Sequence, residues 1–337
     1  MPLDLDSVRA AHERIRPHIK RTPVLTSSRL NEANGASLFF KCENFQKIGA
    51  FKARGATNAV FVLDDAVARH GVATHSSGNH GAALARAAKL RGIPAHIVMP
   101  SNSAKVKVRA VESYGAQIVF CEPNDASREA ACADVIAKTG ATLIHSFENE
   151  NVMAGQGTAA VELLEDVSHL DVVICPVGGG GLLSGTAVAA KSMRPQIKVI
   201  AVEPENADDT AQSFHAGKRM VTKKRFTIAD GLRTNVGELT FPIIQRYVDD
   251  VVTVSEEAII SAMRTIWETM KIVIESSAAV PYAAIAEAKI SPPSRNATPV
   301  EDSRWRARTH DEACVAEKRV GIILTGGNVD LDMLPWK

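Results

Sequence analysis

The chain has 337 residues, of which 45% are apolar and 23% are charged, and its formal net charge is +1. This balance is typical of a globular protein with one large or two ordinary domains, and it gives no electrostatic reason to expect nucleic acid or an anionic membrane as a partner. No apolar run approaches the roughly 20 residues of a membrane span, the acidic N-terminus lacks the features of a signal peptide, and the scattered cysteines, without metal-ligand spacing, favour the reducing cytoplasm.

Short apolar runs alternate with amphipathic segments along the chain, which predicts a parallel α/β architecture. A first helix is expected over residues 5–19, and a short second helix is expected to be capped by Ser28 and ended by Gly35. The expected strands lie around residues 38–40, 72–73, 97–99, 118–120, 143–144, 172–174, 199–201 and 320–324. The expected helices between them cover residues 56–63, 104–114, 127–138 and 157–164, with another starting at Gly81 and another ending at Met193. Residues 291–317 break the pattern with three prolines and four arginines, so we expect a surface loop or a partly disordered insertion there.

Lys52 lies where an apolar run gives way to a helical pattern, directly after Phe51. A lysine at a strand-to-helix junction can be partly desolvated, which lowers its pKa and frees the amine to act as a nucleophile. Taken alone, the residue could equally be a solvated surface lysine. Several distant segments, however, would complete a site around it.

Two of these segments follow expected strands, at the edge where parallel α/β sheets bind ligands. Residues 178–182 are four glycines and a leucine, which lets backbone N–H groups converge on a phosphate at a helix N-terminus, with a mere tight turn as the alternative. They lack the lysine of a P-loop and the spacing of a dinucleotide fold. Residues 74–81 carry hydroxyls, an amide and an imidazole suited to a carboxylate or a ring oxygen, with an ordinary helix cap as the alternative.

Two more segments follow expected strands and offer oxygen atoms. Thr325 stands after the last expected strand, just before two glycines. Glu203 and Asp209 bracket an acidic loop whose carboxylates and backbone carbonyls suit Mg²⁺ or Ca²⁺, with a solvated loop as the alternative.

Together these segments resemble the fold-type II pyridoxal phosphate (PLP) enzymes, and within them the branch of serine racemases and serine/threonine and hydroxyaspartate dehydratases. The resemblance covers nearly the whole chain, and it rests on the combination of Phe51-Lys52, Ser77-Gly78-Asn79-His80 and the tetraglycine loop. It implies a tryptophan synthase β-like α/β fold, with two parallel-sheet domains and the cofactor in the cleft. Residues 1–70 and 148–337 would form the large PLP-binding domain, and residues 71–147 a small mobile domain.

The resemblance also implies how PLP is held. Lys52 would form the Schiff base with Phe51 against the ring, Asn79 would bind the phenolic oxygen, and Thr325 would bind the pyridine nitrogen. The phosphate would be bound by Gly178, Gly179, Gly180, Gly181 and Leu182. A neutral hydroxyl at the pyridine nitrogen does not force protonation there, which disfavours transamination and leaves proton exchange at Cα and loss of a β-substituent.

Substrate and metal ligands follow from the same resemblance. The substrate carboxylate would be bound by Ser76, Ser77, Asn79 and His80, and Arg128 matches a substrate-closing arginine. The family's divalent cation site, for Mg²⁺ or else Ca²⁺ or Mn²⁺, is matched by Glu203, the carbonyl of Ala207, and Asp209. Lys52 would be the base on one face of the substrate, and Ser77 the group on the opposite face.

The implied reaction is the interconversion of L-serine and D-serine, with β-elimination of serine to pyruvate and ammonia. The alternative is an L-threo-3-hydroxyaspartate or L-serine/L-threonine dehydratase that racemises incidentally; more distant alternatives are a non-catalytic PLP-binding protein and a nucleotide-binding protein.

Ile48 replaces the effector-site threonine of animal serine racemases, which argues against ATP as an effector. Phe147 stands where animal serine racemases have a substrate-side asparagine; dehydratases and plant racemases have an aromatic residue there. The expected partners are an amino-acid substrate and a second copy in a homodimer, with no nucleic acid and no membrane.

Overall fold

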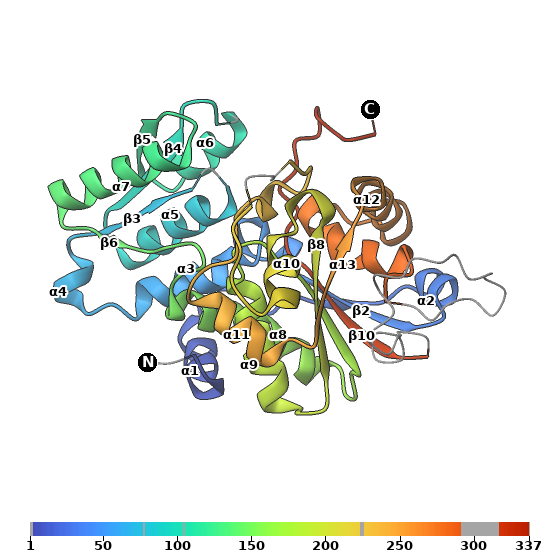
Figure 1. Cartoon of the computed structure of the whole chain (residues 1–337). Helices are drawn as coiled ribbons and strands as arrows, with labels where there is room; N and C mark the ends of the chain where they lie inside the picture. Colours follow the sequence, from blue (N-terminus) through green and yellow to red (C-terminus); the bar gives the residue numbers. More distant parts are fainter. Residues whose placement is uncertain (1–2, 77, 104, 223–225, 291–316, 337) are drawn as a thin grey trace.

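The structure, a computed structural model, describes residues 3–76, 78–103, 105–222, 226–290 and 317–336. Two β-sheets organise these residues into two lobes, and helices cover both faces of each sheet (Figure 1). The predicted parallel α/β architecture is therefore confirmed.

The larger lobe is built on a six-stranded sheet with the order β1-β2-β10-β7-β8-β9, in which β1 is antiparallel to β2 and the other pairs are parallel. Its strands are β1 (Val24–Leu25), β2 (Ser37–Cys42), β7 (Val172–Pro176), β8 (Lys198–Pro204), β9 (Asp250–Val254) and β10 (Arg319–Leu324). Successive side chains of a strand point to opposite faces. In β7, Val172 and Ile174 accordingly pack with α12 (Glu256–Met270) and α13 (Ser276–Ala286), and Val173 packs with α8 (Glu150–Asp166) and α9 (Gly181–Met193).

The smaller lobe is built on a four-stranded parallel sheet with the order β5-β4-β3-β6. Its strands are β3 (Val72–His75), β4 (Ala95–Pro100), β5 (Gln117–Cys121) and β6 (Thr142–Leu143), and all four fall within residues 71–147. On one face, α3 (Lys52–Phe61), α5 (Asn79–Arg91) and α6 (Lys105–Glu112) pack around Ile97. On the other face, α7 (Asp125–Thr139) packs against Val98.

The remaining helices complete the larger lobe and the connections. The helix α1 (Leu5–Ile15) packs on α8 and α9 through Val8 and Ala11. The others are α2 (Ser28–Asn34), α4 (Asp65–Ala68), α10 (Asp209–Ala216), α11 (Thr240–Tyr247) and the 3₁₀ turns η1 (Glu43–Phe45), η2 (Lys47–Gly49), η3 (Glu205–Ala207) and η4 (Asp230–Leu232). Within the described residues, no helix combines the length and the apolar character needed to cross a membrane.

The observed element boundaries differ from the predicted ones in a few instructive places. The first helix ends at Ile15, because Pro17 has no N–H to continue it. The second helix is capped by the side chain of Ser27, one residue earlier than predicted. The third helix begins at Lys52 itself, four residues before the predicted start. The predicted insertion at 291–317 lies outside the described residues except for its last residue.

Candidate active site

Lys52 is the first residue of α3, and hydrogen bonds of Lys52 and its neighbour Phe51 reach both lobes. The neighbouring N–H of Phe51 donates to the carbonyl of Thr325 at 2.9 Å, which ties this junction to the end of β10. The Lys52 amine donates to the carbonyl of Ser146, just beyond β6, also at 2.9 Å. The amine lies 5.1 Å from the centre of the Phe51 ring. It therefore lies where the ends of the two sheets approach each other.

The surroundings of the Lys52 amine favour its uncharged form. Burial lowers the pKa of Lys52 to about 8, and the charge of Glu275 opposes part of this effect. The strand-to-helix position predicts such a desolvated amine. With that pKa, an appreciable fraction of the amine is unprotonated and nucleophilic near neutral pH.

Thr325 carries a buried hydroxyl at the end of β10. The residue is only 3% exposed, and its Oγ1 has no hydrogen-bond partner among the residues that the structure describes. Leaving such a group without a partner costs free energy. The position therefore suits a ligand that supplies the missing hydrogen bond.

Asn79, at the start of α5, contacts two side chains that the sequence analysis did not identify. Its Nδ2 donates to both carboxylate oxygens of Glu275, at 3.0 and 3.1 Å, and its Oδ1 accepts from Asn328 Nδ2 at 2.9 Å. Burial raises the pKa of Glu275 to about 7, and the charge of Asp230 acts in the same direction. These contacts fix the direction in which the Asn79 amide points.

The tetraglycine loop connects β7 to α9. Gly180, with a φ of +89°, lies in the left-handed region that favours glycine. A Cβ on Gly179 would come within 2.2 Å of the Phe147 ring, so only glycine allows the ring this close. Because the four glycines have no side chains, they do not shield the N–H groups of the loop and of the first turn of α9. This arrangement suits a phosphate.

Two histidines near Lys52, His80 and His145, are neutral. Burial is the main cause that lowers the pKa of His80 to about 3 and that of His145 to about 4, and the charge of Lys52 adds to both shifts. His80 Nε2 donates to the carbonyl of Ile144 at 2.9 Å, which leaves Nδ1 as an acceptor without a partner among the described residues. His145 Nδ1 accepts from the backbone N–H of Glu148 at 2.9 Å, so its Nε2 carries the proton.

The state of His80 narrows its predicted part in substrate binding. The one N–H of the neutral His80 ring donates to the carbonyl of Ile144, so the ring cannot also donate to a carboxylate. The N–H groups in the first turn of α5 have no intrahelical partners and can do so. Ser76, just before this turn, accepts from the N–H of Gly78 at 3.3 Å. Ser77 lies outside the described residues.

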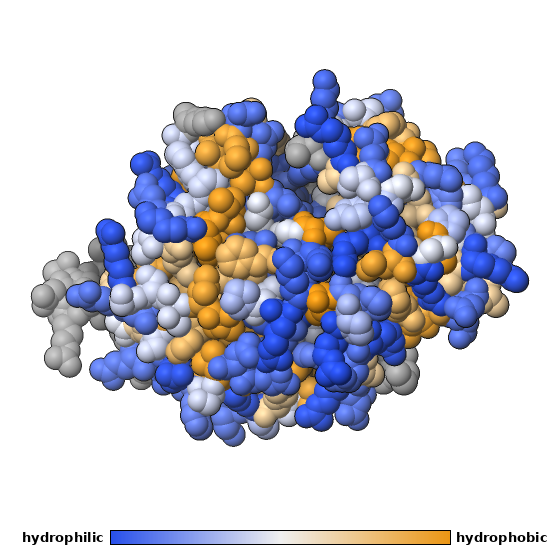
Figure 2. Space-filling view, turned by 180° about the vertical axis from the view of Figure 1, so that it is seen from behind, coloured by the Kyte–Doolittle hydropathy of each residue, from blue (hydrophilic) through white to orange (hydrophobic). Residues whose placement is uncertain are grey.

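Charged side chains line the opening between the lobes. Seen from behind, the surface is hollowed near the top of the molecule (Figure 2). Lys107, on α6 of the smaller lobe, forms a 2.5 Å ion pair with Asp230 of the larger lobe, and both are partly exposed. Arg128, in the first turn of α7, pairs with Asp125. Burial, and to a smaller extent the charge of Arg128, lower the pKa of His75 at the end of β3.

Glu203 and Asp209 form a separate buried group at the end of β8. The two residues are 0% and 1% exposed. Both carboxylate oxygens of Glu203 accept backbone N–H groups of α10, at 3.1 and 2.9 Å, and Asp209 Oδ2 accepts the N–H of Val236 at 2.7 Å. Burial and the nearby carboxylate of Asp209 raise the pKa of Glu203 well above its usual range. Ala207, with a fully buried side chain, lies between them in η3.

The comparisons with known proteins agree with this site. A sequence profile described as "Pyridoxal-phosphate dependent enzyme" matches residues 15–300. The chain belongs to this family. It is 49% identical to a β-hydroxyaspartate dehydratase of Paracoccus denitrificans (strain Pd 1222), over 97% of this chain and 96% of that protein. It is 48% identical to a serine racemase of Arabidopsis thaliana, over 98% of this chain and 95% of that protein.

A solved structure shows the same fold. The crystal structure of serine racemase from Dictyostelium discoideum matches with a TM-score of 0.87 at 46% identity, covering 98% of this chain and 99% of that chain. The fold is therefore that of the fold-type II PLP-dependent enzymes, as the resemblance implied.

The residues of this PLP-dependent enzyme fit the cofactor. Lys52 offers an amine of lowered pKa, and Thr325 a buried hydroxyl that lacks a partner among the described residues. The tetraglycine loop offers N–H groups at a helix N-terminus. Contacts of the chain connect all three. The Lys52 amine donates to the carbonyl of Ser146, and the ring of the next residue, Phe147, lies against the loop. The N–H of Phe51, which precedes Lys52, donates to the carbonyl of Thr325.

Proposed function

We propose that this enzyme is a serine racemase, which interconverts L-serine and D-serine and also eliminates serine to pyruvate and ammonia. The observation that carries the proposal is the Lys52 amine of lowered pKa, whose neighbour Phe51 donates its N–H to the carbonyl of Thr325. The Thr325 hydroxyl has no partner among the described residues, and the chain is 48% identical to a serine racemase. PLP, when bound, supplies an electron-accepting ring that makes the Cα proton of an amino acid removable. Because Thr325 is neutral, the ring nitrogen need not be protonated, which favours proton exchange and β-elimination over transamination.

The residues of the chain divide the work of this reaction. The N–H groups at Asn79 and His80 hold the substrate carboxylate, with Ser76 and Ser77 in the same loop. The phosphate of PLP would be held by the backbone of Gly178, Gly179, Gly180, Gly181 and Leu182, with Phe51 against the ring and the Asn79 amide at its phenolic oxygen. Arg128 closes on the substrate from α7. The Lys52 amine would be the base on one face of Cα.

Racemisation requires a second proton-transferring group on the opposite face, and Ser77 is the proposed one. A serine hydroxyl is a poor base at neutral pH, so its proton must pass to a neighbour. His80 Nδ1 is a neutral acceptor near Lys52 and supports such a relay.

A hydroxyaspartate dehydratase is the second candidate, because the chain is 49% identical to one. A chiral product assay with L-Ser, D-Ser, L-Thr and L-threo-3-hydroxyaspartate separates the two. The proposed function requires D-Ser from L-Ser at a rate comparable with pyruvate formation. Rapid loss of hydroxyaspartate without any D-Ser from L-Ser would replace it with the second candidate.

The pKa of Lys52 predicts how the cofactor-free protein takes up PLP. The amine attacks only when unprotonated, and its pKa is about 8 instead of the ordinary 10.5. The rate of PLP recombination should therefore rise with pH through a midpoint near 8. Stopped-flow absorbance at a series of pH values measures it, with Nα-acetyl-lysine as the unperturbed control. A midpoint shared with that control would contradict the buried amine.

We also propose a divalent cation, Mg²⁺ or else Ca²⁺ or Mn²⁺, at Glu203 and Asp209. Two adjacent buried carboxylates repel each other, and a cation between them would relieve this repulsion. Among the described residues, no three His, Cys, Asp or Glu side chains gather as metal ligands, so further ligands would be backbone carbonyls such as that of Ala207. Hard cations accept such oxygen ligands.

Removing this cation should weaken the protein. Because an ion bound only by the folded state stabilises it, EDTA should lower both the melting temperature and the activity, and added Mg²⁺ should restore both. Asp209→Asn should lose the response to Mg²⁺. Thermal scans with and without chelator measure it. Equal melting curves for the wild type and Asp209→Asn, each unaffected by EDTA, would show that no divalent cation binds at Glu203 and Asp209.

We further propose a domain movement, an oligomeric state and a cellular compartment. Residues 71–147 would close over the substrate, with residues 1–70 and 148–337 as the large domain. The enzyme would be a homodimer, since apolar side chains gather in a band on one face (Figure 2). Phe45 and Val273 are both exposed, and Asn44, next to Phe45, donates through Nδ2 to the carbonyl of Val273. The described cysteines are free thiols, which supports a location in the reducing cytoplasm. Ile48 argues against ATP as an effector.

A further inference from the structure

A buried ionic cluster lies on the inner side of α3, centred on Arg54. The guanidinium donates to Glu43 through Nε and Nη2, at 2.7 and 2.8 Å, and to Glu162 through Nη1 and Nη2, at 2.8 and 2.7 Å. Nη1 also donates to the hydroxyl of Thr158 at 3.1 Å. These contacts use all five N–H donors of the side chain. Arg54 is therefore held in one orientation by η1 on one side and α8 on the other.

The cluster is neutral as a whole and shielded from water. Lys41, on β2, pairs with Glu162 at 2.7 Å and donates to the carbonyl of Thr22 at 2.8 Å. Lys41, Glu43, Arg54 and Glu162 are each at most 1% exposed. Burial works against ionisation of Glu162, but the hydrogen bond from Arg54 lowers its pKa to about 2. Well-packed apolar residues often stabilise a core as much as a buried ionic group does. Stability alone therefore does not account for the cluster.

The position of Arg54 on α3 couples it to Lys52. At about 100° per residue, two residues along a helix differ by about 200°, so Lys52 faces the cleft and Arg54 the interior. Any rotation or shift of the first turn of α3 moves both side chains. Phe51 at the N-cap offers no side-chain hydrogen bond that could hold this turn, unlike Asp4 at the start of α1. Gln156 Oε1 accepts the N–H of Gly55 at 3.2 Å, and the guanidinium of Arg54 adds the larger set of hydrogen bonds that fix this turn.

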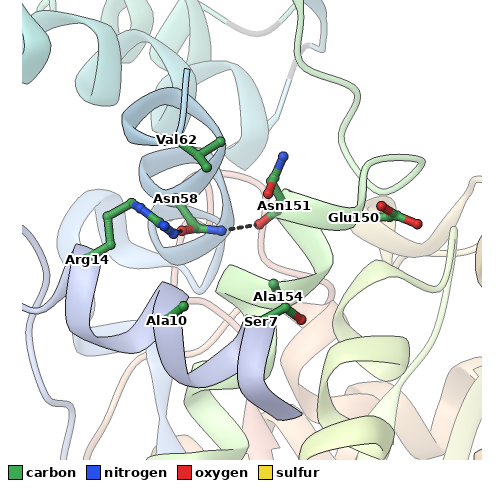
Figure 3. A pocket seen from close by; sticks show the side chains of 8 residues that line it. All are labelled: Ser7, Ala10, Arg14, Asn58, Val62, Glu150, Asn151 and Ala154. Atoms are coloured by element: carbon green, nitrogen blue, oxygen red, sulfur yellow. Dashed lines mark hydrogen bonds between the residues drawn. The ribbon is translucent and has the colours of Figure 1, made fainter. Parts of the chain in front are cut away.

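The rest of α3 is held against α8 and α1. A Cβ on Gly155 would lie 2.6 Å from the Cα of Gly55, so the backbones of α3 and α8 touch with no side chain between them. One turn after Arg54, Asn58 accepts from Arg14 at 2.6 Å and donates to the carbonyl of Asn151 at 2.7 Å. Figure 3 shows these side chains along a cavity of about 200 Å³ between the three helices. The helix is thus anchored along its length, with Arg54 nearest the reacting amine.

We infer that Arg54 is a positioning residue for catalysis: its clamp between Glu43 and Glu162 fixes the first turn of α3 so that the Lys52 amine meets the substrate Cα. The inference rests on the proposed function, because it requires Lys52 to be the reacting amine. Small displacements of a reacting group cost large factors in rate. The clamp should therefore set turnover, with little influence on substrate affinity, because the substrate carboxylate is held by α5.

The test uses two variants of the holoenzyme. Arg54→Lys keeps the charge but loses the fork that binds both carboxylates. Lys41→Met with Glu162→Gln removes one charge of each sign, keeps the cluster neutral and frees Arg54 from its ion pair with α8, so it tests the idea if Arg54→Lys does not fold. We expect kcat per bound cofactor to fall by at least about 10-fold in each, with KM for L-Ser changed by less than about 3-fold. The rates are measured well below each variant's melting temperature.

Arg21→Met is the matched control, because Arg21 pairs with Glu165 at 2.9 Å and with Asp166 on the same helix, α8, but at the surface. It should leave kcat unchanged. Lower melting temperatures with kcat per bound cofactor within about 2-fold of wild type in both test variants would show a merely structural cluster and overturn the inference. Failure of the proposed function would appear differently, as a wild-type protein without serine turnover or one whose visible cofactor band survives Lys52→Ala.

Discussion

The Lys52→Ala variant is expected to lose serine turnover by at least about 10⁴-fold, because one change removes both the attachment of the cofactor and the base at Cα. The Lys52 amine is the one held at the meeting point of the two sheets, 2.9 Å from the carbonyl of Ser146. The visible absorbance of the lysine-bound cofactor should vanish as well. Absorbance spectra of the protein reconstituted with PLP, together with a pyruvate assay, measure both effects.

A surface lysine provides the control for this loss. Lys89→Ala, on the exposed side of α5, should keep both the absorbance band and the activity. An unchanged cofactor band in Lys52→Ala would place the attachment at another lysine and remove the basis of the site. Loss of turnover in the presence of a normal band would separate the base from the attachment point.

The Ser77→Ala variant is expected to separate the two reactions. Elimination from L-Ser needs a proton taken from one face only, and Lys52 can take it alone. Conversion of L-Ser to D-Ser needs a second group on the opposite face, as does elimination from D-Ser. Both of these should fall by about 10²–10⁴-fold, the usual contribution of a positioned acid or base. Elimination from L-Ser should stay within about 10-fold of wild type.

Ser76→Ala is the matched comparison for Ser77, because it removes a hydroxyl from the same loop. It should weaken substrate binding and so affect both reactions by a similar factor. An equal loss of both reactions in Ser77→Ala would mean that Ser77 binds the carboxylate and transfers no proton. Full racemisation by Ser77→Ala would assign the second face to a different group, with His80 the first to examine.

The part of the fold that binds ligands was predictable from the sequence because it consists of repeated local signals. Each strand expected between residues 38 and 201 is a strand of one of the two sheets. The segment with β9 and the helices α10 to α13 was not predicted. In α13, apolar residues surround the whole helix and Pro281 lies inside it, so the sequence has no single hydrophobic period to detect.

The site residues that the sequence analysis missed share one property: their importance depends on contacts between distant segments. Glu275 precedes α13 and reads as an ordinary helix start, yet it binds Asn79 across the cleft. Lys107 and Asp230 are common surface residue types until the fold pairs them. Arg54 lies two residues after Lys52, but no local sequence pattern reveals that two carboxylates bind it in the folded chain.

The central claim, that this PLP-dependent enzyme racemises serine, is tested most directly by incubating the purified holoenzyme with L-Ser in D₂O. Chiral separation with mass spectrometry then follows the D-Ser that appears and the deuterium at its Cα. Because a proton leaves one face and another arrives on the opposite face from groups that exchange with solvent, D-Ser carrying deuterium at Cα should accumulate alongside pyruvate. Pyruvate formation without any D-Ser, at all times up to exhaustion of L-Ser, would contradict the account and make the enzyme a dehydratase.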